Sequence, residues 1–114
     1  MRVGILVNPD AGLGGKLGFK GSDGRAKEAR AAGAEDRAGP RMSQCLSKLE
    51  QLLKSGLNRT NINPEFLTWQ GRMGGDWLAG FDFINLGSSP IESSAGDTSK
   101  LVNDLISNQV DVIL

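Results

Sequence analysis

The glycine-rich stretch that follows the first apolar run constrains the fold of this chain more than any other feature. Residues 2–7 are rich in β-branched residues and end at Asn8-Pro9, which is typical of a buried strand. Glycines then stand at positions 12, 14, 15, 18, 21 and 24. A strand that ends in a glycine-rich turn leaves backbone N–H groups unblocked by side chains, and such groups can surround phosphate oxygens. The junction therefore predicts a phosphate-binding turn, and a flexible loop that binds nothing is the alternative.

The standard phosphate-binding templates do not fit this junction. A Walker A loop requires Gly-Lys-Ser/Thr, whereas Gly15-Lys16 is followed by Leu17 and so lacks the hydroxyl. The dinucleotide fingerprint requires a third glycine at the position that Leu17 occupies. The pattern alone therefore leaves both alternatives open.

The rest of the chain alternates between helical and extended patterns. A single apolar stripe predicts a helix over about 40–55, which contains Met42, Cys45, Leu46, Leu49, Leu52 and Leu53. Further helices are predicted at 25–32, 73–79 (one or two turns) and 95–108, and strands at 2–7, 65–70, 81–86 and 111–114. This alternation predicts an α/β fold with a mostly parallel, Rossmann-like sheet and flanking helices, in which the first and last strands are parallel neighbours or near neighbours. In such sheets ligands bind at the carboxyl ends of the strands, beside the switch in strand order.

Composition narrows the classes of function. The 13 basic and 13 acidic side chains cancel, so no electrostatic footprint for nucleic acid or an anionic membrane is expected. The first apolar run is too short for a membrane helix or a signal-peptide core, and a single cysteine excludes an internal disulfide, so we expect a cytoplasmic protein. The chain has no histidine, which excludes a Ser-His-Asp triad and a His-ligated zinc site within it.

Several motifs resemble the ATP-NAD kinase family, and in particular its AcoX-like branch. The opening resembles that family in residues 7–15 (Val-Asn-Pro-Asp-Ala-Gly-Leu-Gly-Gly) and 17–24 (Leu-Gly-Phe-Lys-Gly-Ser-Asp-Gly). Weaker similarity is found at 27–34, at Gly71-Arg-Met-Gly74 and at 93–98 (Ser-Ser-Ala-Gly-Asp-Thr). Residues 111–114 resemble the strand that leads into the family's Gly-Gly-Asp-Gly motif, which this sequence does not contain.

The resemblance implies a reaction and a set of ligands. The family transfers a phosphoryl group from ATP, with Mg²⁺, to the 2′-hydroxyl of NAD, and it belongs to a superfamily that includes lipid kinases. The chain would be the partial N-terminal nucleotide-binding domain of a two-domain kinase, without the β-rich second domain, and inactive alone because the acceptor-activating aspartate is missing. The alternatives are a kinase of another acceptor (a lipid or small metabolite) and a non-catalytic module that binds nucleotide or a partner. The resemblance also allows a homo-oligomer.

Nine residues are candidates for contact with the nucleotide, and none is a candidate for catalysis. They are Asn8, Gly12, Gly14, Gly15, Lys20, Asp23, Ser94, Asp97 and Thr98. Each has a structural alternative: an Asx turn for Asn8, turn geometry for the glycines, solvent exposure for Lys20, and helix capping for Asp23 and the 94–98 segment. Trp69 and Trp77 could stack on a base, but core packing is the preferred interpretation, as it is for Cys45.

Overall fold

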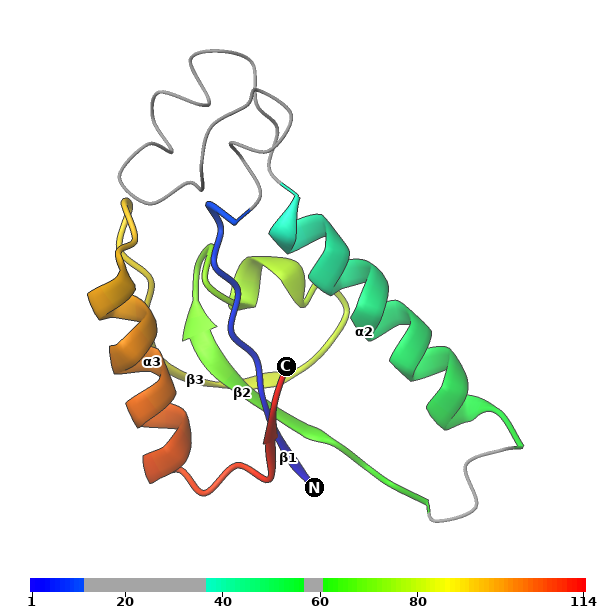
Figure 1. Ribbon diagram of the computed structural model, residues 1–114. Coiled ribbons are helices and arrows are strands. Elements are labelled where there is room, and N and C mark those ends of the chain that lie inside the picture. The colour runs from blue at the N-terminus through cyan, green and yellow to red at the C-terminus, as the bar shows by residue number, and fades with distance from the viewer. Residues whose placement is uncertain (12–36, 57–60) are drawn as a thin grey trace.

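In the part of the chain that the structure describes, four parallel strands form the central sheet. The computed structural model describes residues 1–11, 37–56 and 61–114. Within these residues β1 (Arg2–Gly4), β2 (Glu65–Gln70), β3 (Phe83–Ser88) and β4 (Val112–Ile113) form one sheet in the order β3-β2-β1-β4 (Figure 1). All three pairings are parallel. The predicted α/β fold with a parallel sheet is confirmed, and so is the prediction that the first and last strands are neighbours.

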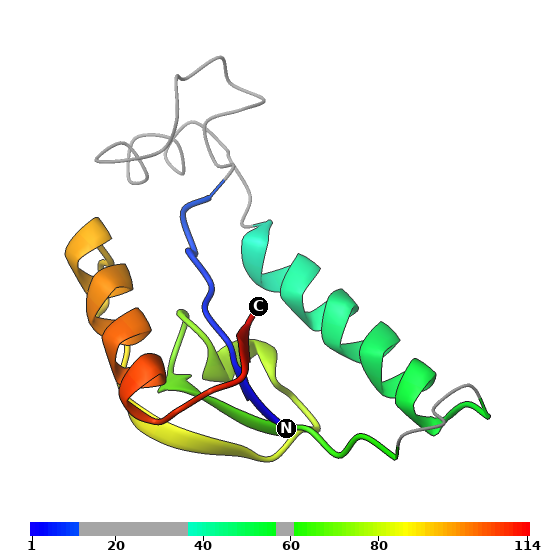
Figure 2. The ribbon, with the colours of Figure 1, turned by 60° about the horizontal axis from the view of Figure 1, so that its bottom comes forward.

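Of the described residues, two helices pack on the sheet through two separate apolar clusters. Helix α2 (Ala38–Lys54) contributes Leu46 to a cluster with Val3 and Ile5, whereas α3 (Ala95–Ser107) contributes Leu101 to a cluster with Leu67. Successive residues of a strand point to opposite faces, and Val3 pairs with Phe66 while Gly4 pairs with Leu67. The two clusters therefore lie on opposite faces of the sheet, with α2 and α3 on either side of the strands (Figures 1 and 2).

The apolar stripe of α2 is narrower than the sequence indicated. Leu46 is fully buried, but Cys45 is exposed and Leu52 is 47% exposed. Each residue turns an α-helix by about 100°, so positions 45 and 52 lie roughly 100–120° around the axis from position 46. Both lie on the same side of it, away from the face that packs on the sheet. The interpretation of Cys45 as a core residue was therefore wrong.

Element boundaries follow local turns. The predicted strand 65–70 is confirmed at both ends. The predicted strand 81–86 begins at Phe83 instead, because Gly80 has a φ of +86° and Phe81 N donates to Leu78 O at 2.9 Å in a turn. Beyond β1 the chain keeps pairing: Ile5 N donates to Leu67 O at 2.9 Å and Leu6 N to Leu114 O at 3.0 Å.

The other predicted helices have different outcomes. The segment 73–79 contains a short 3₁₀ helix, η2 (Gly75–Trp77), and the predicted helix 25–32 lies outside the described residues. Among the helices that the structure describes, none is long and apolar enough to cross a membrane.

Candidate functional site at the carboxyl edge of the sheet

The strand order places a topological switch point beside β1. β2 lies on one side of β1 and β4 on the other, with Val3 paired to both Phe66 and Val112. The pairing with the first strand continues past the end of β4, because Leu114 N donates to Gly4 O at 2.9 Å. In doubly wound sheets the crevice outside the carboxyl ends of the strands at such a point is where ligands bind. The turn that follows β1 starts at this position.

Asn8 forms the first turn after β1. Its side-chain Oδ1 accepts a hydrogen bond from Asp10 N at 3.1 Å, and its carbonyl accepts one from Ala11 N at 3.1 Å. The first bond is that of an Asx turn, which was the structural alternative for this residue, and the second closes a β-turn. Asn8 therefore fixes the direction of the chain as it leaves the sheet, and its contact with a nucleotide stays a prediction.

Hydrogen bonds join the carboxyl ends of three strands. Val7 N donates to Met73 O at 2.8 Å, which ties the end of the first strand to the loop after β2. In the loop after β3, Ser89 Oγ donates to Gln70 O at 2.8 Å and accepts from Met73 N at 3.1 Å. This network joins the loops after β2 and β3 to the segment that follows β1.

Gly71 is required in this network by its backbone and by its surroundings. Its φ is +94°, a conformation that glycine adopts without the penalty of a Cβ. A Cβ at this position would also lie 2.9 Å from Cβ of Ser89. The sequence singled out the turn that contains Gly71 as a motif, but nothing in the sequence indicated Ser89.

The start of α3 is closed by its own side chains. Ser94 Oγ accepts from Asp97 N at 3.4 Å, while Asp97 Oδ2 accepts from Ser94 N at 2.9 Å, so the two residues form a capping box. The carboxylate of Asp97 therefore already faces the positive end of the helix dipole. The hydroxyl of Thr98 makes no hydrogen bond within the part of the chain that the structure describes.

The described candidates share one edge of the molecule. Asn8 follows β1, and the 94–98 segment precedes the helix that follows β3, so both lie at the carboxyl edge of the parallel sheet (Figures 1 and 2). The remaining candidates, Gly12, Gly14, Gly15, Lys20 and Asp23, lie outside the described residues.

The described part of the chain does not supply a metal site of its own. Residues 1–11, 37–56 and 61–114 contain no group of three or more His, Cys, Asp or Glu side chains that could hold a metal ion.

Both tryptophans are packing residues. Trp69 is 8% exposed and donates through Nε1 to Asp104 Oδ2 at 2.7 Å. Trp77 packs against the cluster below α2 and donates through Nε1 to Arg72 O at 2.6 Å. The preferred interpretation of both residues as core packing agrees with this geometry.

Comparison with known proteins gives no relative: no family model matches the chain, and no curated protein or solved structure matches it.

Proposed function

We propose that the chain is a nucleotide-binding domain of a cytoplasmic phosphotransferase of the ATP-NAD kinase type. It would contribute part of the phosphate site for transfer from ATP to the 2′-hydroxyl of NAD. The observation that carries the proposal is the strand order β3-β2-β1-β4, because parallel α/β sheets bind ligands beside the switch in strand order. The glycine-rich junction, whose residues carry the resemblance to that family, begins at this switch point.

We assign to this chain a role in positioning the phosphates of the nucleotide and none in proton transfer. Phosphoryl transfer depends mainly on alignment of the reactants and on neutralisation of phosphate charge, part of which bound Mg²⁺ supplies. Glycines 12, 14 and 15 would let backbone N–H groups approach the phosphates, and Lys20 would add positive charge. We assign no catalytic residue, since the acceptor hydroxyl would need a base that these motifs do not provide.

Calorimetric titration of the chain with ATP and Mg²⁺ tests the proposal. Gly14→Val should abolish binding, because valine blocks close approach of a phosphate and disfavours positive φ. The substitution should cost at most about 1–3 kcal/mol of backbone strain. Gly18→Ala, further along the same stretch, is the matched control and should change the Kd much less. A thermal melt of each variant separates lost binding from lost folding.

Two outcomes would count against the proposal. ATP affinity that is undiminished in folded Gly14→Val protein would mean that the nucleotide binds elsewhere. Failure of the unmodified chain to bind ATP would favour a non-catalytic module that binds a partner.

A further inference from the structure

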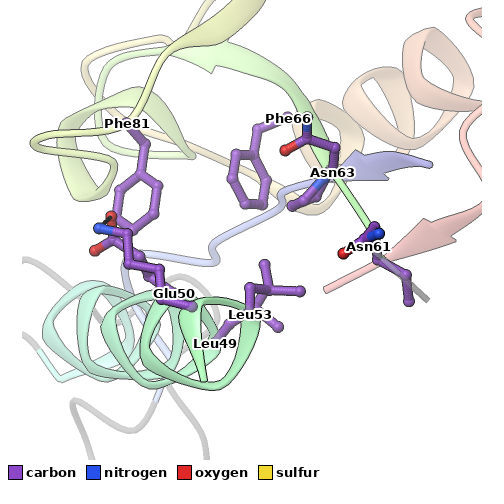
Figure 3. Close-up of a pocket in the computed structure, with 10 residues that line it drawn as sticks. Leu49, Glu50, Leu53, Asn61, Asn63, Phe66 and Phe81 are labelled. Atoms are coloured by element: carbon purple, nitrogen blue, oxygen red, sulfur yellow. Dashed lines mark hydrogen bonds and ion pairs between the residues drawn. The ribbon is translucent and has the colours of Figure 1, made fainter. Parts of the chain in front are cut away.

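A pocket at the amino edge of the sheet lies at the opposite end of the strands from the proposed nucleotide site. It has a volume of about 460 Å³ and lies between the last turns of α2 and the segment 61–64 that leads into β2 (Figure 3). Small-molecule sites usually measure about 300–1,000 Å³ and combine apolar walls with a few polar groups. The volume of the pocket lies in this range, and its lining combines apolar side chains with a few polar ones.

The pocket exists because the last turn of α2 does not pack on the sheet as the preceding turns do. Gly39 and Leu46 are the buried residues of this helix, and Ser43 Oγ donates to Trp77 O at 2.9 Å, so the first half is held down. Further along, Leu53 is only half-buried and does not belong to the apolar cluster below the helix. The end of α2 therefore diverges from the sheet, which Figure 2 shows.

Two aromatic rings form the inner wall. Phe66 and Phe81 are arranged edge to face, with ring centroids 5.6 Å apart and an angle of 86° between the planes. Leu49 and Leu53 lie opposite them on α2 (Figure 3). A third ring between these walls would add aromatic contacts to ordinary apolar burial, and aromatic pairs are favourable beyond the area that they bury.

The polar groups of the lining are neutral in sum. Glu50 and Lys54 form an ion pair at 2.8 Å, so the two charges of the lining cancel. Asn61 and Asn63 supply amides that can both donate and accept hydrogen bonds. This combination favours an uncharged ligand with a hydrogen-bonding edge and disfavours an anion such as ATP.

We propose that this amino-edge pocket binds a neutral, planar heteroaromatic molecule of about the size of indole or a nucleobase. The ring would lie between the phenylalanines and the leucines, with its polar edge toward the asparagine amides. The site does not depend on the phosphate-binding function at the carboxyl edge.

Indole is the probe, titrated into ¹⁵N-labelled chain and followed by two-dimensional NMR. Saturable shifts are expected at the amides of Leu53, Asn63, Phe66 and Phe81. The amides of Asn8 and Thr98 should not move, whereas they are the ones that ATP should move if the carboxyl-edge site exists. Failure of either site is therefore seen independently of the other.

Adjacent leucines of α2 provide a matched pair of variants. Leu53→Trp should fill the pocket and weaken indole binding at least about tenfold, equivalent to 1.4 kcal/mol. Leu52→Trp places the same ring on a neighbouring exposed position that does not line the pocket, and should leave the Kd nearly unchanged. Equal affinities in the two variants would overturn the proposal, as would the absence of saturable shifts in the unmodified chain.

A second variant tests the polar edge and does not depend on the folding of Leu53→Trp. Asn63→Ala should weaken indole but not 1-methylindole, which lacks the N–H donor. Asn61 is unsuitable for this test because its φ is 49°, a conformation that asparagine tolerates better than alanine does. Asn61→Ala would therefore change the backbone strain as well as the amide. If Asn63→Ala weakened the binding of indole and of 1-methylindole to the same extent, the assigned hydrogen bond would be contradicted. If Asn63→Ala changed the binding of neither probe, that hydrogen bond would be refuted.

Discussion

Gly39 in the first turn of α2 lies directly against the indole ring of Trp77. A Cβ on Gly39 would overlap with Cε2, Cζ2 and Cδ2 of that ring. The indole cannot shift freely, since its Nε1 donates to Arg72 O at 2.6 Å and the carbonyl of Trp77 accepts from Ser43 Oγ at 2.9 Å. This contact fastens the start of α2 to the loop that follows β2.

Replacement of Gly39 by alanine should therefore destabilise the protein. In an exposed helix interior the same substitution normally stabilises by about 1 kcal/mol. Here we expect a loss of about 1–3 kcal/mol in the free energy of unfolding, because overpacking forces the ring or the helix to move. Urea denaturation followed by tryptophan fluorescence measures the change. Gly56→Ala is the control, because a Cβ there would have nothing within 4 Å and the free energy should change little; a stabilised Gly39→Ala chain would contradict the packing.

The side chain of Thr68 and the backbone of Gly74 occupy adjoining space, which makes the cost of their substitution non-additive. Thr68 is fully buried and its Oγ1 donates to Ile5 O at 2.6 Å. A Cβ on Gly74 would overlap with that same Oγ1.

Gly74→Ala should lower the free energy of unfolding by about 1–3 kcal/mol, because the new methyl group overpacks the site. In a Thr68→Ala background the same change should cost less, with a coupling energy of about 0.5–3 kcal/mol. A double-mutant cycle from urea denaturation measures this coupling. Strictly additive losses would mean that the two positions do not share space in solution.

These two contacts show where prediction from the sequence stops. Local patterns were sufficient to predict the strand 65–70, the start of the helix at 95 and the parallel direction of the strands. These features depend on periodicity, on turn residues and on the alternation of strands with helices. The contact of Gly39 with Trp77 joins positions that are distant in sequence, and no periodicity indicates it. At the candidate site the turn at Asn8 was predictable from Asn-Pro, whereas Ser89 became visible only when the loops after β2 and β3 were placed side by side.

Trp69 and Asp104 form a hydrogen bond that joins β2 to α3. The donor Nε1 lies 2.7 Å from Asp104 Oδ2, and the indole is 8% exposed. Asp104→Ala would leave this partly buried N–H without a partner and should cost about 1.5–3 kcal/mol, the range for hydrogen bonds to charged groups. Asp104→Asn keeps a carbonyl acceptor and should cost less. Thermal melts of the unmodified chain and of the two variants check this order. Equal melting temperatures for all three would show that the bond contributes nothing.

The start of α3 allows capping and ligand binding to be separated by two neighbouring substitutions. Ser94→Ala removes the N-cap acceptor for Asp97 N and should cost about 1 kcal/mol of stability. Thr98→Val preserves the shape of a side chain whose hydroxyl has no hydrogen-bond partner among the described residues, so stability should not change.

If the proposed nucleotide site includes this hydroxyl of Thr98, ATP affinity in Thr98→Val should fall by about fivefold, equivalent to 1 kcal/mol for one neutral hydrogen bond. Calorimetric ATP titration and a thermal melt on both variants give the two quantities. A Thr98→Val chain with unchanged ATP affinity, beside a destabilised Ser94→Ala chain, would restrict this segment to capping and confine the phosphate site to the turn after β1.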